Sequence, residues 1–277
     1  MLCEKISILE KHISDEETLG VLSQNNRRKL ELFIIKKSNI KDDVMIENYL
    51  YNNILSTISI FSERTLEEWL WAGQKQEIIE WILTGNIEYE KNSFLQQYRH
   101  RLQIFPDHDR EIRMGFEFSK LIHCYNEGKY FFEVFDYLDS YKYVIQALHH
   151  LGRLSVVQQG IHPEITVWNQ VKRLEPEVYK LYRELTESRE TIDKRLELLF
   201  LAGDYLINSQ TKTSSKHVLS IIKESLCGLT YNELSTKREV SIYGSELQAL
   251  LGYLIEKGLL EQAEGEDGIV RYLYKEV

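Results

Sequence analysis

The chain has little proline, little cysteine and no long apolar run. Of its 277 residues, three are Pro and three are Cys. The cysteines, Cys3, Cys124 and Cys227, are far apart and odd in number, which excludes a disulfide framework and a CxxC metal site. No stretch approaches the ~18 apolar residues of a membrane-spanning helix, and the first residues do not have the pattern of a signal peptide. We therefore expect a cytoplasmic protein with free thiols and no membrane partner.

An excess of basic charge is also missing. The formal net charge is -9 at pH 7, and the acidic balance is spread along the chain. Basic and acidic residues number 13 and 16 in residues 1–105, 13 and 17 in 106–211, and 8 and 10 in 212–277. None of these parts is a basic module of the kind that a nucleic-acid backbone attracts, so DNA is a less favoured partner.

The chain is long and apolar enough to bury several cores. It has 43% hydrophobic and 28% charged residues, and 277 residues exceed one ordinary domain. The patterns described below predict an α+β multidomain protein that is mostly helical. We place its three parts at residues 1–105, 106–211 and 212–277.

The first part is predicted to be mixed α/β. Thr65 and Glu68 have the spacing of a capping box and predict a helix start, and Thr84-Gly85 predicts a helix end. Alternating or β-rich runs predict strands between these signals. The expected elements are a helix at 4–13, strands at 19–22, 30–35, 54–60 and 87–89, and a last helix from Ser93.

The second part is predicted to be entirely helical. Residues 106–208 have apolar residues at helical spacing and contain four or five helices, the last at 192–207. All three prolines, Pro106, Pro163 and Pro176, are predicted to mark helix starts. The small polar segment 209–215 predicts a linker.

The third part is predicted to be a winged helix-turn-helix. Helices at 216–225, 230–235 and 245–257 precede strands at 259–262 and 270–274. The third helix has no Arg, and Gln248 is its main candidate for reading a base. We expect Tyr243, Gln248 and Tyr253 to face outward, which favours a protein partner or self-association over DNA.

A polar stripe crosses the central helix of the second part. Its members recur at i, i+3, i+7, i+10 and i+14 and project in one direction: Asp139, Lys142, Gln146, His149 and Arg153. One interpretation is a solvated helix face. The other is a cleft in which Lys142 and Arg153 bind phosphate and His149 donates a hydrogen bond. Because His149 and His150 are adjacent, we expect one of the two to be structural.

Two residues after this helix are open to the same two interpretations. His162, in the segment His162-Pro163-Glu164, is either part of a helix entry or a ligand contact. Trp168 either fills a core or stacks on a base.

The second part carries a resemblance to a known family. The blocks that carry it are Phe131-Phe132-Glu133, Tyr137-Leu138-Asp139, Ala147-Leu148-His149-His150-Leu151-Gly152-Arg153, His162-Pro163-Glu164, Val167-Trp168-Asn169-Gln170-Val171 and Glu175-Pro176-Glu177-Val178-Tyr179-Lys180-Leu181-Tyr182. The sequence resembles the bacterial nucleotidyltransferase-like family. Its members join a nucleotidyltransferase-type α/β domain, an all-α substrate-binding-like bundle and a C-terminal winged helix. The resemblance implies the same three domains here, in the same order.

The resemblance also implies a metal-dependent site, from which this sequence departs. Nucleotidyl transfer needs divalent metal held by two or three carboxylates, one pair being spaced D-x-D on a strand after a Gly-Ser turn. In the matching stretch Gly20 lacks an adjacent Ser, Lys29 occupies the first acidic position, and Glu31 alone remains of the pair. The first domain is therefore expected to be degenerate, with Glu31 as its one assignable catalytic residue.

We favour binding of a nucleotide or other phosphate-bearing small molecule between the first two domains, with catalysis reduced or lost. We expect no metal site, and the predicted ligand-binding residues are Lys29, Lys142, His149, Arg153, His162 and Trp168. One alternative is an active transferase that uses Mg²⁺ and Glu31 to modify a small molecule, RNA or protein. The other is a winged-helix DNA-binding regulator whose front half senses a ligand.

Overall fold

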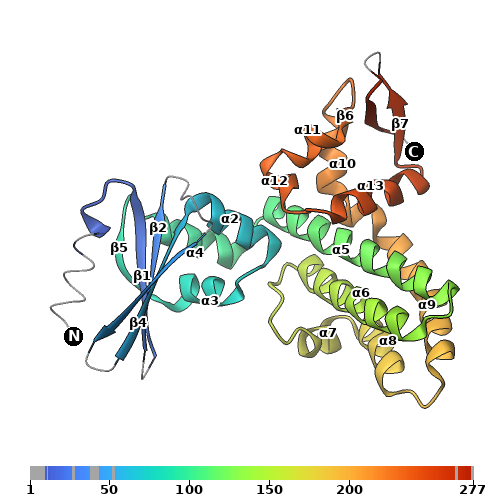
Figure 1. Cartoon of the computed structure of the whole chain (residues 1–277), viewed down its shortest axis with the longest axis horizontal. Helices are drawn as coiled ribbons and strands as arrows, with labels where there is room; N and C mark the ends of the chain where they lie inside the picture. Colours follow the sequence, from blue (N-terminus) through green and yellow to red (C-terminus); the bar gives the residue numbers. More distant parts are fainter. Residues whose placement is uncertain are drawn as a thin grey trace. The chain divides into compact units, whose positions relative to one another are not determined.

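The computed structural model describes residues 10, 12–26, 29–37, 44–51, 54–265 and 268–275. The chain divides into two compact units, Met1–Pro106 and Asp107–Val277, which we call unit 1 and unit 2 (Figure 1). Among the described residues, no helix is long and apolar enough to cross a membrane.

Unit 1 contains a five-stranded sheet with the order β3-β4-β2-β1-β5. Strands β2 and β4 are parallel, and the other neighbouring pairs are antiparallel. The strands are β1 (Thr18–Asn26), β2 (Lys29–Lys36), β3 (Met45–Tyr51), β4 (Ile54–Ser62) and β5 (Asn86–Glu90). The predicted strands are confirmed. Strand β3 was not predicted, because it is an edge strand held by its pairing with β4 and interrupted by the polar Glu47 and Asn48.

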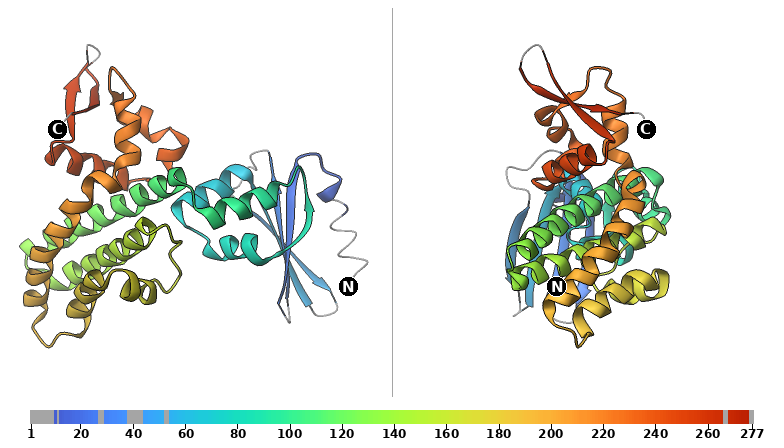
Figure 2. Two further views of the ribbon diagram at one scale, coloured as in Figure 1. Left: turned by 180° about the vertical axis from the view of Figure 1, so that it is seen from behind. Right: turned by 90° about the vertical axis from the view of Figure 1, so that its right-hand side faces the viewer.

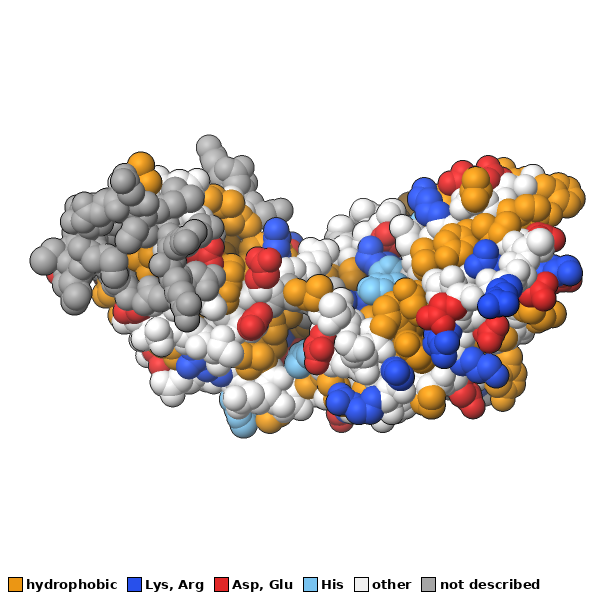
Figure 3. All heavy atoms as spheres, turned by 90° about the horizontal axis from the view of Figure 1, so that it is seen from below, with side chains coloured by type: hydrophobic (Ala, Val, Ile, Leu, Met, Phe, Trp, Pro, Cys, Tyr) orange, Lys and Arg blue, Asp and Glu red, His pale blue; other side chains and the backbone are white. Residues whose placement is uncertain are grey.

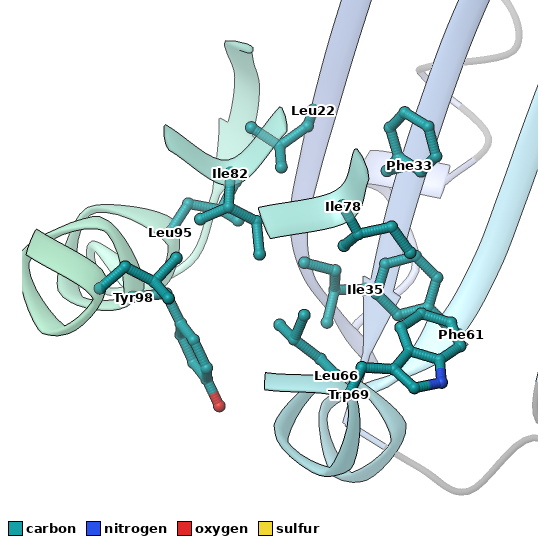
Figure 4. Packing of buried hydrophobic residues seen from close by; sticks show 11 residues of the cluster. Leu22, Phe33, Ile35, Phe61, Leu66, Trp69, Ile78, Ile82, Leu95 and Tyr98 are labelled. Carbon is teal, nitrogen blue, oxygen red and sulfur yellow. The ribbon is translucent and has the colours of Figure 1, made fainter. Parts of the chain in front are cut away.

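Three helices of unit 1 pack on one face of the sheet, namely α2 (Glu63–Ala72), α3 (Gln76–Thr84) and α4 (Phe94–Ile104). Side chains alternate along β2, so Phe33 and Ile35 join the core beneath the helices and Ile34 joins the opposite face. Figure 4 shows Phe33, Ile35 and Leu66 within this core. The Phe33 ring stacks on Trp81 of α3 with a centroid distance of 3.9 Å.

The start of α2 differs from the prediction. The helix begins at Glu63, and Ser62 is its N-cap, with the Ser62 side chain accepting a hydrogen bond from the amide of Thr65 at 3.1 Å. The predicted capping box at Thr65 and Glu68 is therefore wrong, because the cap lies three residues earlier on extended backbone. The predicted end of α3 at Gly85 is confirmed. The helix predicted at 4–13 lies almost entirely outside the described residues.

The first part of unit 2 is helical, as predicted. Its helices are α5 (Asp107–Glu133), α6 (Tyr137–Gln158), α7 (Trp168–Leu174), α8 (Pro176–Glu187) and α9 (Ile192–Ser214). Helices α5 and α6 lie side by side (Figure 2). Gly128 permits their close approach, since a Cβ there would lie 2.7 Å from Cγ2 of Val144, and Ser140 Oγ donates to the Gly128 carbonyl at 2.8 Å.

Two of the three prolines stand where the sequence predicts. Pro176 is the first residue of α8, and Pro106 directly precedes α5. Pro163 lies in the loop before α7, five residues ahead of Trp168, so the predicted helix start there is wrong.

The predicted linker at 209–215 is also wrong, because α9 continues to Ser214. Thr211 Oγ1 donates to the carbonyl of Ile207 at 3.0 Å, so its polar side chain is satisfied inside the helix. Thr211 is buried, and its hydroxyl lies 3.0 Å from the hydroxyl of Tyr253. The winged helix therefore packs directly on the helical part of unit 2.

The winged helix has the three predicted helices and the predicted hairpin. Its elements are α10 (Lys216–Lys223), β6 (Leu229–Thr230), α11 (Tyr231–Ser235), α12 (Arg238–Ser241), α13 (Glu246–Glu256), β7 (Leu260–Glu264) and β8 (Val270–Tyr274). The strands form a sheet in the order β6-β8-β7. Thr230 and Glu233 form a capping box at the start of α11. The sequence missed β6 and α12, which have only two and four residues.

The outward surface predicted for the winged helix is largely wrong. Tyr243 is fully buried, and any side chain at position 115 of α5 would overlap its hydroxyl. Tyr253 is buried against Phe118 of α5, with the rings 5.9 Å apart. Gln248 alone of the three is exposed. The prediction considered only the core of the winged helix itself, whereas α5 and α9 cover a second face.

Candidate functional site

A pocket of about 670 Å³ opens within unit 2, bounded by α5, α6, α7, α8 and the first residue of α13. We call it the unit 2 pocket. Its volume lies in the range of small-molecule sites. Figure 3 shows histidine atoms beside basic and hydrophobic side chains on unit 2. The basic and histidine side chains that line the unit 2 pocket are Lys120, His123, His149 and His150.

One wall of the pocket is aromatic. Trp168 of α7 stacks on Tyr182 of α8, with ring centroids 3.8 Å apart and planes at 20°. The ring of His149 meets Trp168 edge-on at 6.0 Å. Gly152 of α6 allows α7 to come this close, because a Cβ there would lie 3.1 Å from Val171 Cγ2 and 3.4 Å from Trp168. The position of Trp168 in the aromatic wall therefore requires glycine at position 152.

A buried ionic cluster lies behind the pocket and is centred on Glu117 of α5. We call it the Glu117 cluster, comprising Arg113, Glu117, His150 and Arg153. Oε1 of Glu117 lies 2.7 Å from Arg113 Nη2 and 2.8 Å from Arg153 Nε, and Oε2 lies 2.7 Å from His150 Nδ1. The Glu117 side chain is only 1% exposed. Two guanidinium groups therefore share one buried carboxylate.

Glu117 and Arg113 keep their charges. Burial alone would raise the pKa of Glu117, but Arg113, the hydrogen bond with His150, and Arg153 together hold it well below its usual range. Burial lowers the pKa of Arg113 to about 10, so its guanidinium stays protonated at neutral pH.

Glu117 also orients His150. An ionised carboxylate accepts hydrogen bonds only, so Nδ1 of His150 must carry a proton and donate it to Glu117. The ring edge that remains for the pocket carries Nε2. This nitrogen accepts a hydrogen bond in the neutral ring and donates one in the imidazolium.

The second histidine, His149, is uncharged at neutral pH. Burial lowers its pKa, and the neighbouring charges of Arg153 and His150 lower it further. Its neutral ring offers one hydrogen-bond donor and one acceptor. Both adjacent histidines line the pocket. One of the two was expected to be structural. His150 has that role in part, because its Nδ1 is held by Glu117.

The pocket has a single carboxylate among its lining residues, Glu246 of the winged helix. Its Oε1 lies 3.3 Å from Nζ of Lys120, and both side chains are partly buried. Burial would raise the pKa of Glu246, but hydrogen bonds from its own amide and from Lys120 leave it lowered. The Glu246 carboxylate is therefore ionised at neutral pH.

The predicted ligand-binding residues of unit 2 separate into two groups. His149 and Trp168 line the pocket, as does Gln146 of the same stripe. Arg153 turns inward to Glu117 and does not line the pocket. Lys142 is exposed and lies over the ring of Tyr143 at 4.7 Å. The stripe thus faces the pocket with part of its length only.

His162 belongs to a loop that another side chain fixes. Gln170 Nε2 donates to the carbonyl of His162 at 3.1 Å, and Gln170 Oε1 accepts from the amide of Glu164 at 2.8 Å. His162 does not line the unit 2 pocket.

Sequence reasoning missed several lining residues: Lys120, His123, Tyr182 and Glu246. Lys120 and His123 are three apart on α5, a spacing that puts both on one helix face and was a usable signal. Tyr182 lies only fourteen residues after Trp168. Nothing local identifies Glu246, because it reaches the pocket through the docking of the winged helix.

In unit 1, Glu31 lies on β2 on the same side as Phe33, beneath the helices. Its neighbours in register are Gln24 on β1 and Thr57 on β4. Lys29 begins β2, and its side chain is outside the described part of the chain. Among the described residues, no three His, Cys, Asp or Glu side chains are grouped as a metal site requires. One carboxylate beside an amide and a hydroxyl does not fit the donor set of a Mg²⁺ pair.

Three family models match the chain in succession. They are a nucleotidyltransferase-like domain at residues 5–110, a YgxA-like substrate binding domain at 111–210 and a helix-turn-helix domain at 216–275. The boundaries at 105 and 211 stay a prediction.

The relatives agree with this succession. The uncharacterized protein YgxA of Bacillus subtilis (strain 168) is 37% identical over 269 residues, which cover 94% of this chain and 90% of YgxA. The crystal structure of a nucleotidyltransferase-like protein from Exiguobacterium sibiricum 255-15 superposes with a TM-score of 0.89 at 27% identity, covering 98% of each chain. The chain therefore belongs to the YgxA family of nucleotidyltransferase-like proteins.

Proposed function

We propose that the protein binds a nucleotide or another phosphate-bearing small molecule in the unit 2 pocket, and that catalysis by unit 1 is reduced or lost. The observation that carries this proposal is the pairing of an aromatic wall with a group of nitrogen donors in one pocket. Such a combination suits a ligand with a flat apolar part and an anionic part. The ligand position predicted from the sequence, between the first two domains, stays a prediction.

The charges around the pocket favour an anion. Lys120 lines the pocket beside Glu246, and the guanidinium groups of Arg113 and Arg153 lie behind its wall, where both contact Glu117. A phosphate would accept a charge-assisted hydrogen bond from Lys120 and a further hydrogen bond from the N–H of the neutral His149 ring.

The residues at the expected metal site of unit 1 support the proposal that catalysis is reduced or lost. Position 29 holds a lysine where the family's metal-binding acid is expected, and Glu31 stands between Gln24 and Thr57 across the sheet. A single carboxylate cannot bridge two metal ions to the phosphates of a nucleotide. An active Mg²⁺-dependent transferase therefore remains the less favoured alternative.

The DNA-binding regulator is also less favoured. Helix α13, the last helix of the motif, contains no Arg or Lys between Glu246 and Glu256. Its exposed positions include Gln248, Gly252 and Glu256, which offer one amide and one carboxylate. A groove-reading helix needs basic or amide side chains on this face. A protein partner or self-association through the winged helix stays a proposal.

Calorimetric titration tests the proposal. We expect wild-type protein to bind at least one of ATP, GTP, UTP, AMP and inorganic pyrophosphate, and Lys120→Ala to weaken that binding about ten- to a hundredfold. Lys142→Ala is the matched control, because Lys142 is an exposed lysine of the adjacent helix that does not line the pocket. Equal losses in the two variants, or no binding of any of the five probes, would contradict the proposal.

A further inference from the structure

The unit 2 pocket is where a bound ligand meets the winged helix. Glu246, the first residue of α13, contributes the pocket's single lining carboxylate. The remaining lining residues come from α5, α6, α7 and α8. The Lys120–Glu246 ion pair therefore joins the wall of the pocket to the docking surface of the winged helix.

The rest of that docking surface lies outside the pocket. The Tyr243 hydroxyl lies against Gly115, and this hydroxyl is 3.0 Å from Nδ1 of His217. Tyr253 contacts the hydroxyl of Thr211 at 3.0 Å. None of these five residues lines the pocket. A ligand can reach one contact of the docked winged helix and cannot reach the others.

An anionic ligand changes the energy of that one contact. Lys120 is the pocket cation nearest to Glu246, and a phosphate that binds Lys120 comes close to the Glu246 carboxylate. Both side chains are partly buried, so the repulsion between the two anions is screened less than it would be in bulk water. The ligand consequently binds better to a conformation in which Glu246 has moved away from Lys120.

We propose that an anionic ligand in the unit 2 pocket weakens the docking of the winged helix on α5 by displacing Glu246 from Lys120. This inference rests on the proposed function, since it assumes a phosphate-bearing ligand in that pocket. Coupling between two equilibria is reciprocal. Weaker docking must therefore tighten ligand binding by the same factor.

The first experiment removes the carboxylate. With ATP as the probe at constant ionic strength, Glu246→Gln should bind ATP about five- to tenfold more tightly than wild type. Glu256→Gln is the matched control, because Glu256 is an exposed glutamate of the same helix and does not line the pocket. It should bind ATP as the wild type does.

The second experiment weakens docking away from the pocket. Gly115→Ala places a methyl group where the Tyr243 hydroxyl lies, and Tyr243→Phe removes that hydroxyl and its hydrogen bond to His217. Both variants should bind ATP more tightly, although neither position touches the pocket. Gly252→Ala is the control, because a Cβ at this α13 position meets no atom within 4 Å.

Hydrogen exchange measures docking directly. Saturating ATP should speed the exchange of amides in α13 and leave the strands of unit 1 unchanged. Suppose that ATP binds the wild type but does not change exchange in α13, and that Glu246→Gln, Gly115→Ala and Tyr243→Phe all bind ATP within twofold of wild type. The proposed coupling is then wrong, and the proposed function stands. If neither ATP nor any other probe binds, the proposed function is wrong and the coupling falls with it.

Discussion

The hydroxyl of Tyr243 in the winged helix lies where a side chain of residue 115 in α5 would be, so a glycine and a buried tyrosine form one contact between two parts of the chain. Docking buries the whole Tyr243 side chain and leaves its hydroxyl beside Nδ1 of His217. Burial and the nearby Glu239 raise the pKa of Tyr243, so the phenol stays protonated and can donate to that nitrogen.

Truncation of this tyrosine should destabilise unit 2. Tyr243→Ala leaves a cavity at Gly115, and we expect it to lower the free energy of unfolding by about 3–5 kcal/mol. Tyr205→Ala is the control, because Tyr205 is a 76% exposed tyrosine of α9 and should change stability little. Urea titrations followed by far-UV circular dichroism give the comparison, and similar midpoints for Tyr243→Ala and wild type would contradict it.

The Glu117 cluster predicts a second stability effect. Glu117→Gln removes the carboxylate that both buried arginines, Arg113 and Arg153, contact, and breaking a buried ion pair in this way costs about 3–5 kcal/mol. Glu197→Gln changes an exposed glutamate of α9 in the same way and should be nearly neutral. Chemical denaturation measures both variants. An equally small effect of the two substitutions would show that the cluster does not need its carboxylate.

The pattern of the chain predicted most of the fold. Helices α5, α6 and α9 are long and their apolar positions repeat at helical spacing, so the period alone locates them. The linker predicted at 209–215 is wrong for a physical reason. Thr211 donates a hydrogen bond to the carbonyl of Ile207 in its own helix, and its hydroxyl is buried against the hydroxyl of Tyr253. A polar composition predicts a linker only where the side chains face water.

The candidate site was predictable only in part. His149 and Trp168 lie in two of the blocks that carry the family resemblance, and both line the pocket. Lys120 and Glu246 are 126 residues apart and meet only because the winged helix docks on α5. Arg113 and Glu117 have the i,i+4 spacing of a common surface pair, and the packing of α6 is what buries them.

The stability of the protein should fall in mild acid because of His217. Burial lowers the pKa of this histidine below the ordinary value of 6.5, although its hydrogen bond to Glu239 opposes the shift. As pH falls through 6.5, the unfolded chain takes up a proton that the folded chain resists, so the folded state loses stability.

Melting temperatures measured from about pH 8 to about pH 5 test this effect. Glu239 should stay ionised throughout this pH range, which lies above 4.5, the ordinary pKa of a glutamate. The pKa of Glu239 is lowered further, because its hydrogen bond from His217 and the nearby His108 outweigh the effect of burial. His217→Gln should reduce the slope, and His100→Gln, at an exposed histidine of unit 1, should leave it unchanged. Parallel curves for all three proteins would count against the assignment to His217.

The proposed degeneracy of unit 1 predicts a lack of transferase activity. Incubation with labelled ATP and Mg²⁺ or Mn²⁺ should give no transfer to the protein itself or to RNA, because the described residues contain no group of three His, Cys, Asp or Glu side chains that could hold the ions. Glu47→Gln is a suitable control, since Glu47 pairs with Ile58 and points to the opposite face of the sheet. Turnover that Glu31→Gln abolishes and Glu47→Gln preserves would establish the active alternative.

The most direct measurement of the central claim is a calorimetric titration of ATP, GTP, UTP, AMP and inorganic pyrophosphate into wild-type protein, Lys120→Ala and Lys142→Ala at one pH and ionic strength. We predict that at least one of these probes binds saturably to the wild type and to Lys142→Ala, and binds about ten- to a hundredfold more weakly to Lys120→Ala. Binding of none of the probes, or an affinity that is the same in all three proteins, would contradict the assignment of the unit 2 pocket as the ligand site.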